Sequence, residues 1–376
     1  RASIGVQDFD PEIQKTIDAF NGIVKEEIGA TLDEDIQVRL CPSNDCYIED
    51  LRQEARYDLD RAREAAITHG VAVQWPRLMI LVKLAGINDL FVTRQMIAHE
   101  LTHMLQRHFS GQVGDKANRW IREGMADWMG ALVASRMTGG TGMAAERLSL
   151  WRFERLNVLS LLPQRLSAKE LDDADFERWL AWLNEKRQPY AASDLMMLTL
   201  AERLGDGIFP ALKGYLECVS GFSFESTCFR KHFGLEQKAF YADYESWLTQ
   251  ALKDNGRVEI VADEADDAER EEVGKAYREG LERLKTRFGK DLPISIRIYL
   301  HPDRDAMTLS VAKTLGLNPG DAARLTSYGV FQNGLALHLN LGRLNTSERL
   351  AEAIQASQTQ YYISLVGLPD GGWAAQ

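Results

Sequence analysis

Residues 93–108 read TRQMIAHELTHMLQRH and carry the strongest prediction in the chain. Apolar residues recur through this segment at helical spacing, so we expect a helix whose apolar face packs into a core. His99 and His103 stand four residues apart, which places both imidazoles on one helix face, one turn apart. Two neutral imidazoles so placed can bind one Zn²⁺, and the adjacent Glu100 can take a proton from water at the open coordination position. The alternative is a surface helix with two unrelated histidines.

A second predicted helix, residues 118–137, supplies carboxylates. Glu123 follows the second histidine by 20 positions and would complete a site of two histidines and one glutamate, with one position left for water. Asp127 lies one turn further and can accept the N–H of a ligating histidine, which fixes its tautomer. Gly124 and Ala126 are small enough to let the two helices pack closely. The alternatives are an exposed helix charge for Glu123 and a surface salt bridge for Asp127.

The two motifs resemble those of the gluzincin metallopeptidases, in the aminopeptidase-like "peptidase MA" group. The resemblance rests on HELTH at 99–103 and EGMAD at 123–127, with softer likenesses at 190–205 and 222–234, and it covers roughly residues 1–252. It implies an α+β, zincin-like catalytic domain in which a small mixed sheet and an active-site helix precede a helical subdomain. It also implies zinc-dependent hydrolysis of peptide bonds, with one Zn²⁺ per chain.

The resemblance further implies a role for each motif residue. The metal ligands would be His99, His103 and Glu123. Glu100 would be the general base, and Asp127 would support a ligating histidine from behind.

A tyrosine or histidine that stabilises the oxyanion completes the site in the resembled group. Tyr190 is our candidate, because it opens a predicted helix after Pro189 at a family-like distance from Glu123. The alternative is a packing tyrosine, and His232 is the reserve candidate. Metzincins fit less well, because they require H-x-x-G-x-x-H and Gln106 replaces the glycine.

The composition and net charge limit which classes of protein and partner are compatible with this chain. The chain has 376 residues, of which 45% are hydrophobic and 26% charged, as is typical of a soluble globular protein of two or three domains. The net charge is −11 and no Lys/Arg-rich run offsets it, which argues against nucleic acid or an anionic membrane surface as the main partner. The strongest apolar run, residues 78–82, is too short to span a bilayer. The expected partner is a peptide or protein substrate; the sequence indicates no oligomeric state.

The cysteines fall into two local pairs, and the simplest connectivity joins Cys41 to Cys46 and Cys218 to Cys228. Two disulfides would indicate an oxidising compartment, so we expect a periplasmic or secreted protein. The alternative is four free thiols in a cytosolic protein. The chain begins at Arg1 rather than Met, which fits either a removed signal peptide or a trimmed chain.

The rest of the chain is interpreted from its periodicity. The predicted helices are 11–29, 48–68 and 118–137, the last ending at Gly139-Gly140, and 144–252 is mainly helical. The predicted strands are 36–40 and 78–84. We expect 78–84 to be an edge strand that could pair with an extended peptide. The catalytic domain would span 1–256, with sheet and zinc helices in 1–140 and the helical subdomain in 141–256, followed by a second domain at 257–376.

That second domain resembles the start of the chain. Residues such as Ile36, Val38 and Leu40 match Ile296, Ile298 and Leu300 at an offset of 260, and later matches fit an offset of 253. We therefore predict a diverged, incomplete, zincin-like repeat, although similar helix–strand texture could produce such matches by chance. Under the offset of 253, the site residues map to Glu352, Ala353, Ala356 and Gln376. The repeat would then be non-catalytic.

Three functions follow from these features. The leading hypothesis is a zinc metallopeptidase. The second is a zinc-bearing binding or scaffold protein of peptidase fold without turnover, although the intact Glu100 argues against it. The third is a peptidase that its own second domain restrains.

Overall fold

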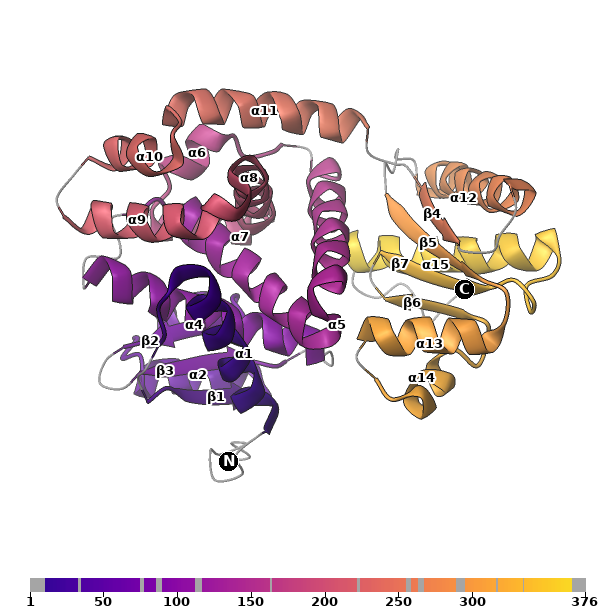
Figure 1. Cartoon of the computed structure of the whole chain (residues 1–376), viewed down its shortest axis with the longest axis horizontal. Coiled ribbons are helices and arrows are strands. Elements are labelled where there is room, and N and C mark those ends of the chain that lie inside the picture. Colours follow the sequence, from indigo (N-terminus) through magenta and orange to yellow (C-terminus); the bar gives the residue numbers. More distant parts are fainter. Residues whose placement is uncertain are drawn as a thin grey trace. The chain divides into compact units, whose positions relative to one another are not determined.

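The computed structural model describes residues 11–32, 35–74, 78–85, 90–111, 117–162, 164–221, 224–254, 258–262, 267–288, 295–315, 317–333 and 335–366. The chain has an α+β architecture and divides into two compact units (Figure 1). Unit 1 comprises Arg1–Ala144 and Gln164–Thr249, and unit 2 comprises Ala145–Pro163 and Gln250–Gln376.

This division differs from the expected boundary at residue 256, because residues 145–163 belong to unit 2. The reason is a hydrophobic contact between this segment and two residues of the chain after residue 256. The contact joins Leu150, Phe153 and Leu161 to Leu284 and Leu335. Asn157 adds two buried hydrogen bonds to the backbone of Ser295, one to its N–H and one to its carbonyl.

Unit 1 begins with α1 (Pro11–Ile28), β1 (Gln37–Cys41), α2 (Asn44–Gln53), α3 (Leu59–Ala65), β2 (Gly70–Val73), β3 (Met79–Lys83) and α4 (Leu90–Ser110). It continues with α5 (Arg119–Ser160), α6 (Ala168–Asp172), α7 (Phe176–Asn184), α8 (Pro189–Leu204), η2 (Gly205–Gly207), α9 (Ile208–Ser220), α10 (Glu225–Phe233) and α11 (Gln237–Lys253). The part of α5 after Ala144 and the part of α11 after Thr249 belong to unit 2. The helix expected at 48–68 is thus two helices, with Asp58 capping the second through a hydrogen bond from Arg61 N.

The sheet of unit 1 has the order β1-β3-β2. β1 pairs parallel to β3, with Val38 opposite Ile80, and β2 pairs antiparallel to β3, with Val71 opposite Leu81. The expectation that residues 78–84 form an edge strand is therefore wrong, since β3 is central. All five residues of β3 are buried and the first four are apolar, a run that is typical of a strand covered on both faces.

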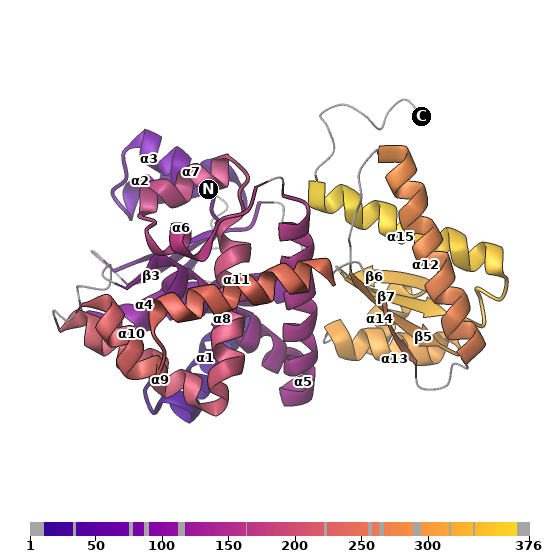
Figure 2. The ribbon, with the colours of Figure 1, turned by 90° about the horizontal axis from the view of Figure 1, so that it is seen from above.

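Helices cover this sheet and set the position of the histidine helix. Met79 and Leu81 of β3 pack with Tyr47 and Leu51 of α2. α4 packs against β2 and β3 and also against α1. The view in Figure 2 shows α4 beside β3. The 93–108 prediction thus falls within a longer helix that rests on the sheet.

Two glycines of α5 permit close helix packing. A Cβ at Gly124 would lie 2.7 Å from the carbonyl oxygen of Ser193 in α8, and a Cβ at Gly130 would lie 2.5 Å from that of Gln95 in α4. The close approach to α4 therefore occurs at Gly130, whereas Gly124 contacts α8. The predicted helix stop at Gly139-Gly140 is wrong, because α5 continues to Ser160.

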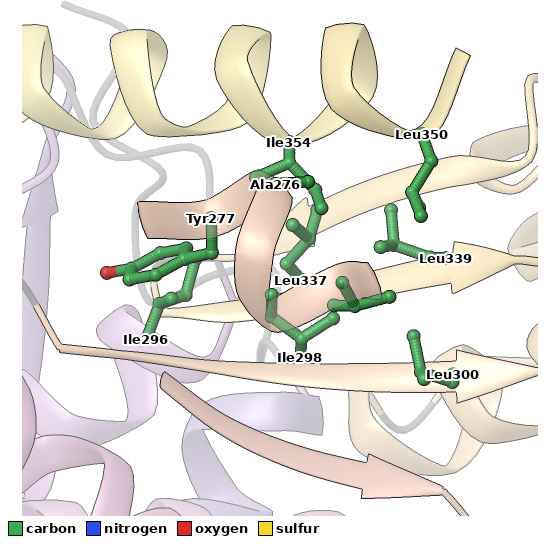
Figure 3. Close-up of a cluster of buried hydrophobic side chains, with 10 residues drawn as sticks. Ala276, Tyr277, Ile296, Ile298, Leu300, Leu337, Leu339, Leu350 and Ile354 are labelled. Atoms are coloured by element: carbon green, nitrogen blue, oxygen red, sulfur yellow. The ribbon is translucent and has the colours of Figure 1, made fainter. Parts of the chain in front are cut away.

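Unit 2 contains β4 (Val258–Ala262), α12 (Asp267–Phe288), β5 (Ile296–His301), α13 (Arg304–Leu315), α14 (Pro319–Leu325), β6 (Val330–Asn333), β7 (Ala336–Asn340) and α15 (Ser347–Val366). Its sheet has the order β4-β5-β7-β6, with only β6 antiparallel to its neighbour. Alternate residues of β5 and β7 form its core with α12 and α15 (Figure 3).

The element order of unit 2 after β4 repeats that of residues 11–110, from α1 to α4. The strand pairing is also the same, because β1, β3 and β2 pair as β5, β7 and β6 do. α3 and α14, like β2 and β6, are related by an offset of 260.

The later elements correct the second offset. β3 begins at Met79 and β7 at Ala336, and α4 begins at Leu90 and α15 at Ser347, which gives 257 in place of 253. The counterparts of the HELTH residues at positions 99, 100 and 103 are then Ala356, Ser357 and Gln360. Gln376, the counterpart expected for Glu123, lies outside the described residues.

Candidate metal centre

α4 places the two histidines of the HELTH motif edge to face. The ring centroids of His99 and His103 are 4.7 Å apart, and their Nε2 atoms are 3.0 Å apart. This proximity follows from the spacing of four residues, because side chains at i and i+4 lie above one another on a helix. The spacing therefore predicted the geometry of the pair correctly.

The far nitrogen of each ring has its own partner. His99 Nδ1 lies 2.7 Å from Asp127 Oδ1 on α5, and a carboxylate can only accept, so this nitrogen carries the proton. His103 Nδ1 lies 2.9 Å from Gln106 Oε1. The Gln106 amide donates through Nε2 to the carbonyl of Arg122 at 2.8 Å, so its oxygen must face the imidazole and His103 Nδ1 also donates. In the neutral form of each ring, Nε2 is therefore the nitrogen that bears the lone pair.

Glu123 of α5 brings a third oxygen to the same point. Its Oε2 lies 3.5 Å from His103 Nε2 and 3.8 Å from His99 Nε2. Its other oxygen, Oε1, accepts from Arg119 Nη1 at 2.9 Å. The guanidinium of Arg119 also lies over the rings of Phe176 and Trp179. Arg119 thus orients the Glu123 carboxylate so that one oxygen faces the imidazoles.

The electrostatics of the cluster favour a cation. Burial opposes a positive charge on His99, yet Asp127, with Glu100 and Glu123, raises the pKa of this imidazole to about 10. Burial likewise opposes a negative charge on Glu123, but His103 and Arg119 hold the pKa of its carboxyl well below the usual range. The charges that favour a second proton on His99, at Nε2 between the two rings, would equally favour Zn²⁺ in place of that proton. Zinc would then meet two nitrogen donors and an ionised oxygen, the donor set of a three-residue zinc site.

Glu100 lies beside this cluster in a nearly closed environment. Its Oε1 lies 3.9 Å from His99 Nε2, and the residue is 3% exposed. Among the described residues, no group hydrogen-bonds its Oε2, and burial raises the pKa of its carboxyl. A Cβ at Gly70 of β2 would lie 2.5 Å from Glu100 Oε1. A side chain at this point would displace the Glu100 carboxylate.

The cluster opens into a cleft of about 630 Å³ in unit 1. His99, Glu100, His103 and Glu123 line it, as does Tyr190 at the start of α8. The Tyr190 ring packs edge to face on Trp179. Burial and the charges of Glu123 and Asp127 raise the pKa of the Tyr190 hydroxyl well above its ordinary value, so that hydroxyl keeps its proton at neutral pH.

The reserve candidate lies elsewhere. His232 is on α10, where its ring stands against Gly214 of α9, and it is absent from the cleft lining. His108 lies in the last turn of α4 as expected.

The cysteines form one disulfide. Cys218 and Cys228 are bonded, whereas Cys41 and Cys46 are free, so the prediction of a bond between the latter two is wrong. Cys41 Sγ donates to Asp50 Oδ2 at 3.0 Å, and burial together with this carboxylate raises the pKa of the thiol. Cys41, Cys46 and Asp50 are near enough to share a cation. However, Arg39 already neutralises Asp50 through a 2.8 Å ion pair, so this group has the character of a structural network.

Three residues of the centre escaped the sequence interpretation. Gln106 counted only as the residue that breaks the metzincin pattern, although its position three residues after His103 places it within reach of that ring. Arg119 precedes Glu123 by one helical turn and offered the same signal. The sequence carries no signal for Gly70, because its contact with the Glu100 carboxylate depends on how β2 packs against α4.

Comparison of the chain with protein-family models, with curated proteins and with solved structures found no match. Across the described part of the chain, no helix combines the length and apolar character needed to cross a membrane.

Proposed function

We propose that this protein is a zinc-dependent peptidase whose centre and surrounding fold are gluzincin-like. The observation that carries the proposal is the convergence of His99 Nε2, His103 Nε2 and Glu123 Oε2 next to a buried carboxylate oxygen of Glu100 without a hydrogen-bond partner among the described residues. A structural metal site has no need of such a carboxylate.

Each residue has a distinct task in the proposed reaction. His99, His103 and Glu123 would hold Zn²⁺, which would supply a Lewis acid that activates water and polarises the scissile carbonyl. Glu100 would take the proton of the attacking water and pass it to the leaving amine. Its raised pKa suits this task, because a base that must also act as an acid works best when its pKa is near the operating pH.

Tyr190 is the proposed donor to the oxyanion. It lines the cleft and keeps its proton at neutral pH, so it can donate a hydrogen bond where negative charge develops. Removing one such donor typically lowers kcat by about 10²–10³-fold.

The free edge of β2 is the proposed binding site for the peptide backbone. Lys83 N donates to His69 O at 2.7 Å, and bonded pairs alternate along an antiparallel ladder. Gly70 and Ala72 therefore direct their backbone N–H and C=O groups away from β3. Both residues line the cleft. An extended peptide could pair with them directly in front of Glu100 by displacing the long hydrogen bonds of Thr68 Oγ1 to Gly70 O and of Arg107 Nη1 to Ala72 O.

Unit 2 is proposed to be a peptidase-like repeat without a metal centre. It has Ala356, Ser357 and Gln360 at the positions that correspond to the motif residues of unit 1, and these side chains supply neither imidazole nor carboxylate. A structural or substrate-docking role fits it best. The Cys218–Cys228 disulfide supports a periplasmic or secreted location.

The test compares zinc-loaded wild type with Glu100→Gln on a mixed peptide library, with products identified by mass spectrometry. We expect cuts by the wild type and a rate at least about 10²-fold lower for the variant, the usual contribution of a general base. Glu64→Gln, an exposed change on α3, is the matched control and should cut like the wild type.

The zinc content of each protein is measured in the same experiment, because it separates the alternatives. Zinc in both proteins with no cut by either would favour a binding or scaffold protein. Equal cutting by wild type and Glu100→Gln would remove Glu100 from the mechanism.

A further inference from the structure

We infer that the cleft selects peptides with an acidic side chain about two residues from the scissile bond, which Arg107 and Arg61 would bind. This inference rests on the proposed peptidase function and deepens it by naming a substrate class. It is carried by the place of the two guanidinium groups at the cleft, where Arg107 contacts β2, and by the partners of the other charges around the cleft.

Arg107 stands one helical turn after His103 on α4 and lines the cleft. Its Nη1 lies 3.5 Å from the carbonyl oxygen of Ala72, one of the groups that β2 directs away from the sheet. The same strand passes Glu100 at Gly70. Gly70 and Ala72 are two residues apart, which is about 7 Å along an extended chain. A peptide paired with this edge would therefore bring a side chain two residues from the reacting bond to Arg107.

Arg61 lies at the same cleft from α3. Its guanidinium stands 4.3 Å from the centre of the Tyr57 ring, which holds the cation in place and leaves its edge open to a ligand. Within the described ranges, neither Arg61 nor Arg107 forms an ion pair with a carboxylate. An arginine guanidinium that is not paired with a carboxylate of the protein is suited to binding a substrate carboxylate through two hydrogen bonds.

The acidic groups around the cleft are already engaged. Asp172 accepts from Tyr241 and Gln237, and Asp173 pairs with Lys169. Asp175 caps the first turn of α7 through the N–H of Arg178. Glu123 would bind the metal and is held by Arg119. Arg61 and Arg107 are thus the cleft cations that no carboxylate pairs with in the described part of the chain, so the substrate group complementary to them is acidic.

The experiment measures the preference for an acidic substrate as the ratio of kcat/KM for a peptide with Glu to kcat/KM for the same peptide with Gln. Peptides that the wild type cuts are prepared in pairs that differ only by Glu or Gln at each position from three before to three after the scissile bond. The kcat/KM ratio of each pair is measured for wild type, Arg107→Glu and Arg61→Glu. A ratio is needed because Arg107 also favours the ionised form of Glu100, so its loss can change the rate on every peptide.

We expect the wild type to prefer Glu by about tenfold or more at a position about two residues from the cut, as a charge-assisted hydrogen bond allows. Arg107→Glu should abolish or reverse that preference, and Arg61→Glu should reduce it. Arg63→Glu is the matched control: it lies on the same helix, pairs with Asp60 and does not line the cleft, so it should retain the wild-type ratio.

Two results would overturn the inference alone: cleavage by the wild type with equal kcat/KM for Glu and Gln at every position, or a wild-type ratio that survives in Arg107→Glu. A wild type that cuts no peptide would overturn the proposed function and this inference with it.

Discussion

The protons on two imidazoles determine what the centre can hold. Asp127 and Gln106 accept hydrogen bonds from the two Nδ1–H groups, so His99 Nε2 and His103 Nε2 face each other at 3.0 Å with at most one proton between them. Two buried histidines with only a packing role would share a proton through a hydrogen bond. Here the carboxylates of Asp127, Glu100 and Glu123 favour a positive charge on this pair, and Zn²⁺ would supply that charge in place of the shared proton. This is the residue-scale argument for a metal.

A different residue at the cleft predicts a pH dependence. Burial raises the pKa of Asp172, so the native protein binds this proton more tightly than the unfolded chain does. The resulting stability is present below the unfolded-state pKa and is lost as pH rises through the higher native pKa. We therefore expect the melting temperature of the wild type to fall relative to Asp172→Asn as pH rises from about 4 to about 7.

Thermal unfolding of both proteins across this pH range is the measurement. Asp173→Asn is the control, because Asp173 sits next to the buried group but pairs at the surface with Lys169. A difference between wild type and Asp172→Asn that stays constant with pH would contradict the assigned pKa direction.

At the residue scale, the spacing in the sequence predicted the set of side chains that meet. The i, i+4 spacing places His99 with His103 on one face of α4, and Glu123 with Asp127 on one face of α5. The expectation that these two faces meet came from the motif and its resemblance to a known family. Two other contacts at the site could not be predicted in this way. The contact of Arg107 with Ala72 and the approach of Gly70 to Glu100 depend on the path of β2, which no local pattern specifies.

At the scale of elements, the sequence predicted helices and strands better than their ends. α5 passes through Gly139-Gly140, because each glycine costs a helix only about 1 kcal/mol, and packing along a long helix outweighs that. The central place of β3 was missed because a buried edge strand and a buried central strand share the same apolar run.

The crossing of α4 and α5 predicts an effect of one methyl group. In Gly130→Ala, the new Cβ would meet the carbonyl oxygen of Gln95 at 2.5 Å, so the two helices must separate. Overpacking of this kind costs about 1–3 kcal/mol. We expect a lower melting temperature and weaker zinc binding, since α4 carries the histidines and α5 carries Glu123.

Gly22→Ala is the matched control for this change. Gly22 lies inside α1, and a Cβ there would meet nothing within 4 Å, so the substitution should stabilise its helix by up to about 1 kcal/mol. Calorimetry and zinc titration report both effects. Unchanged stability and zinc affinity in Gly130→Ala would contradict the close crossing of the helices.

At the scale of the whole molecule, the sequence predicted part of the repeat correctly but not the division of the chain into two units. The offset of 260 relates α3 to α14 and β2 to β6. The later offset required correction to 257, because helical matches recur after one turn and a displacement of four residues still superimposes apolar positions. Composition gave no indication that residues 145–163 belong to unit 2, because that is a long-range contact.

This assignment predicts that a chain ending at residue 256 is unstable. Such a chain would expose Leu150 and Phe153, which pack against Leu284 and Leu335, and would leave Asn157 without Ser295. We expect aggregation or a melting temperature below that of the full chain. Replacing Leu150 and Phe153 by Gln in the shortened chain should restore solubility.

Size-exclusion chromatography and thermal unfolding of the two shortened chains and the full chain are the measurements. A soluble, equally stable chain ending at 256 would contradict the assignment of this segment to unit 2. It would also allow a direct test of whether unit 2 restrains activity.

The most direct test of the metal centre is the zinc content of purified, zinc-equilibrated protein, measured by mass spectrometry for wild type, His103→Ala and His108→Ala. His108 is an exposed histidine of the same helix and serves as the control. The account predicts one zinc per chain in the wild type and in His108→Ala, and none in folded His103→Ala. Zinc retained by His103→Ala, or absent from the wild type, would contradict it.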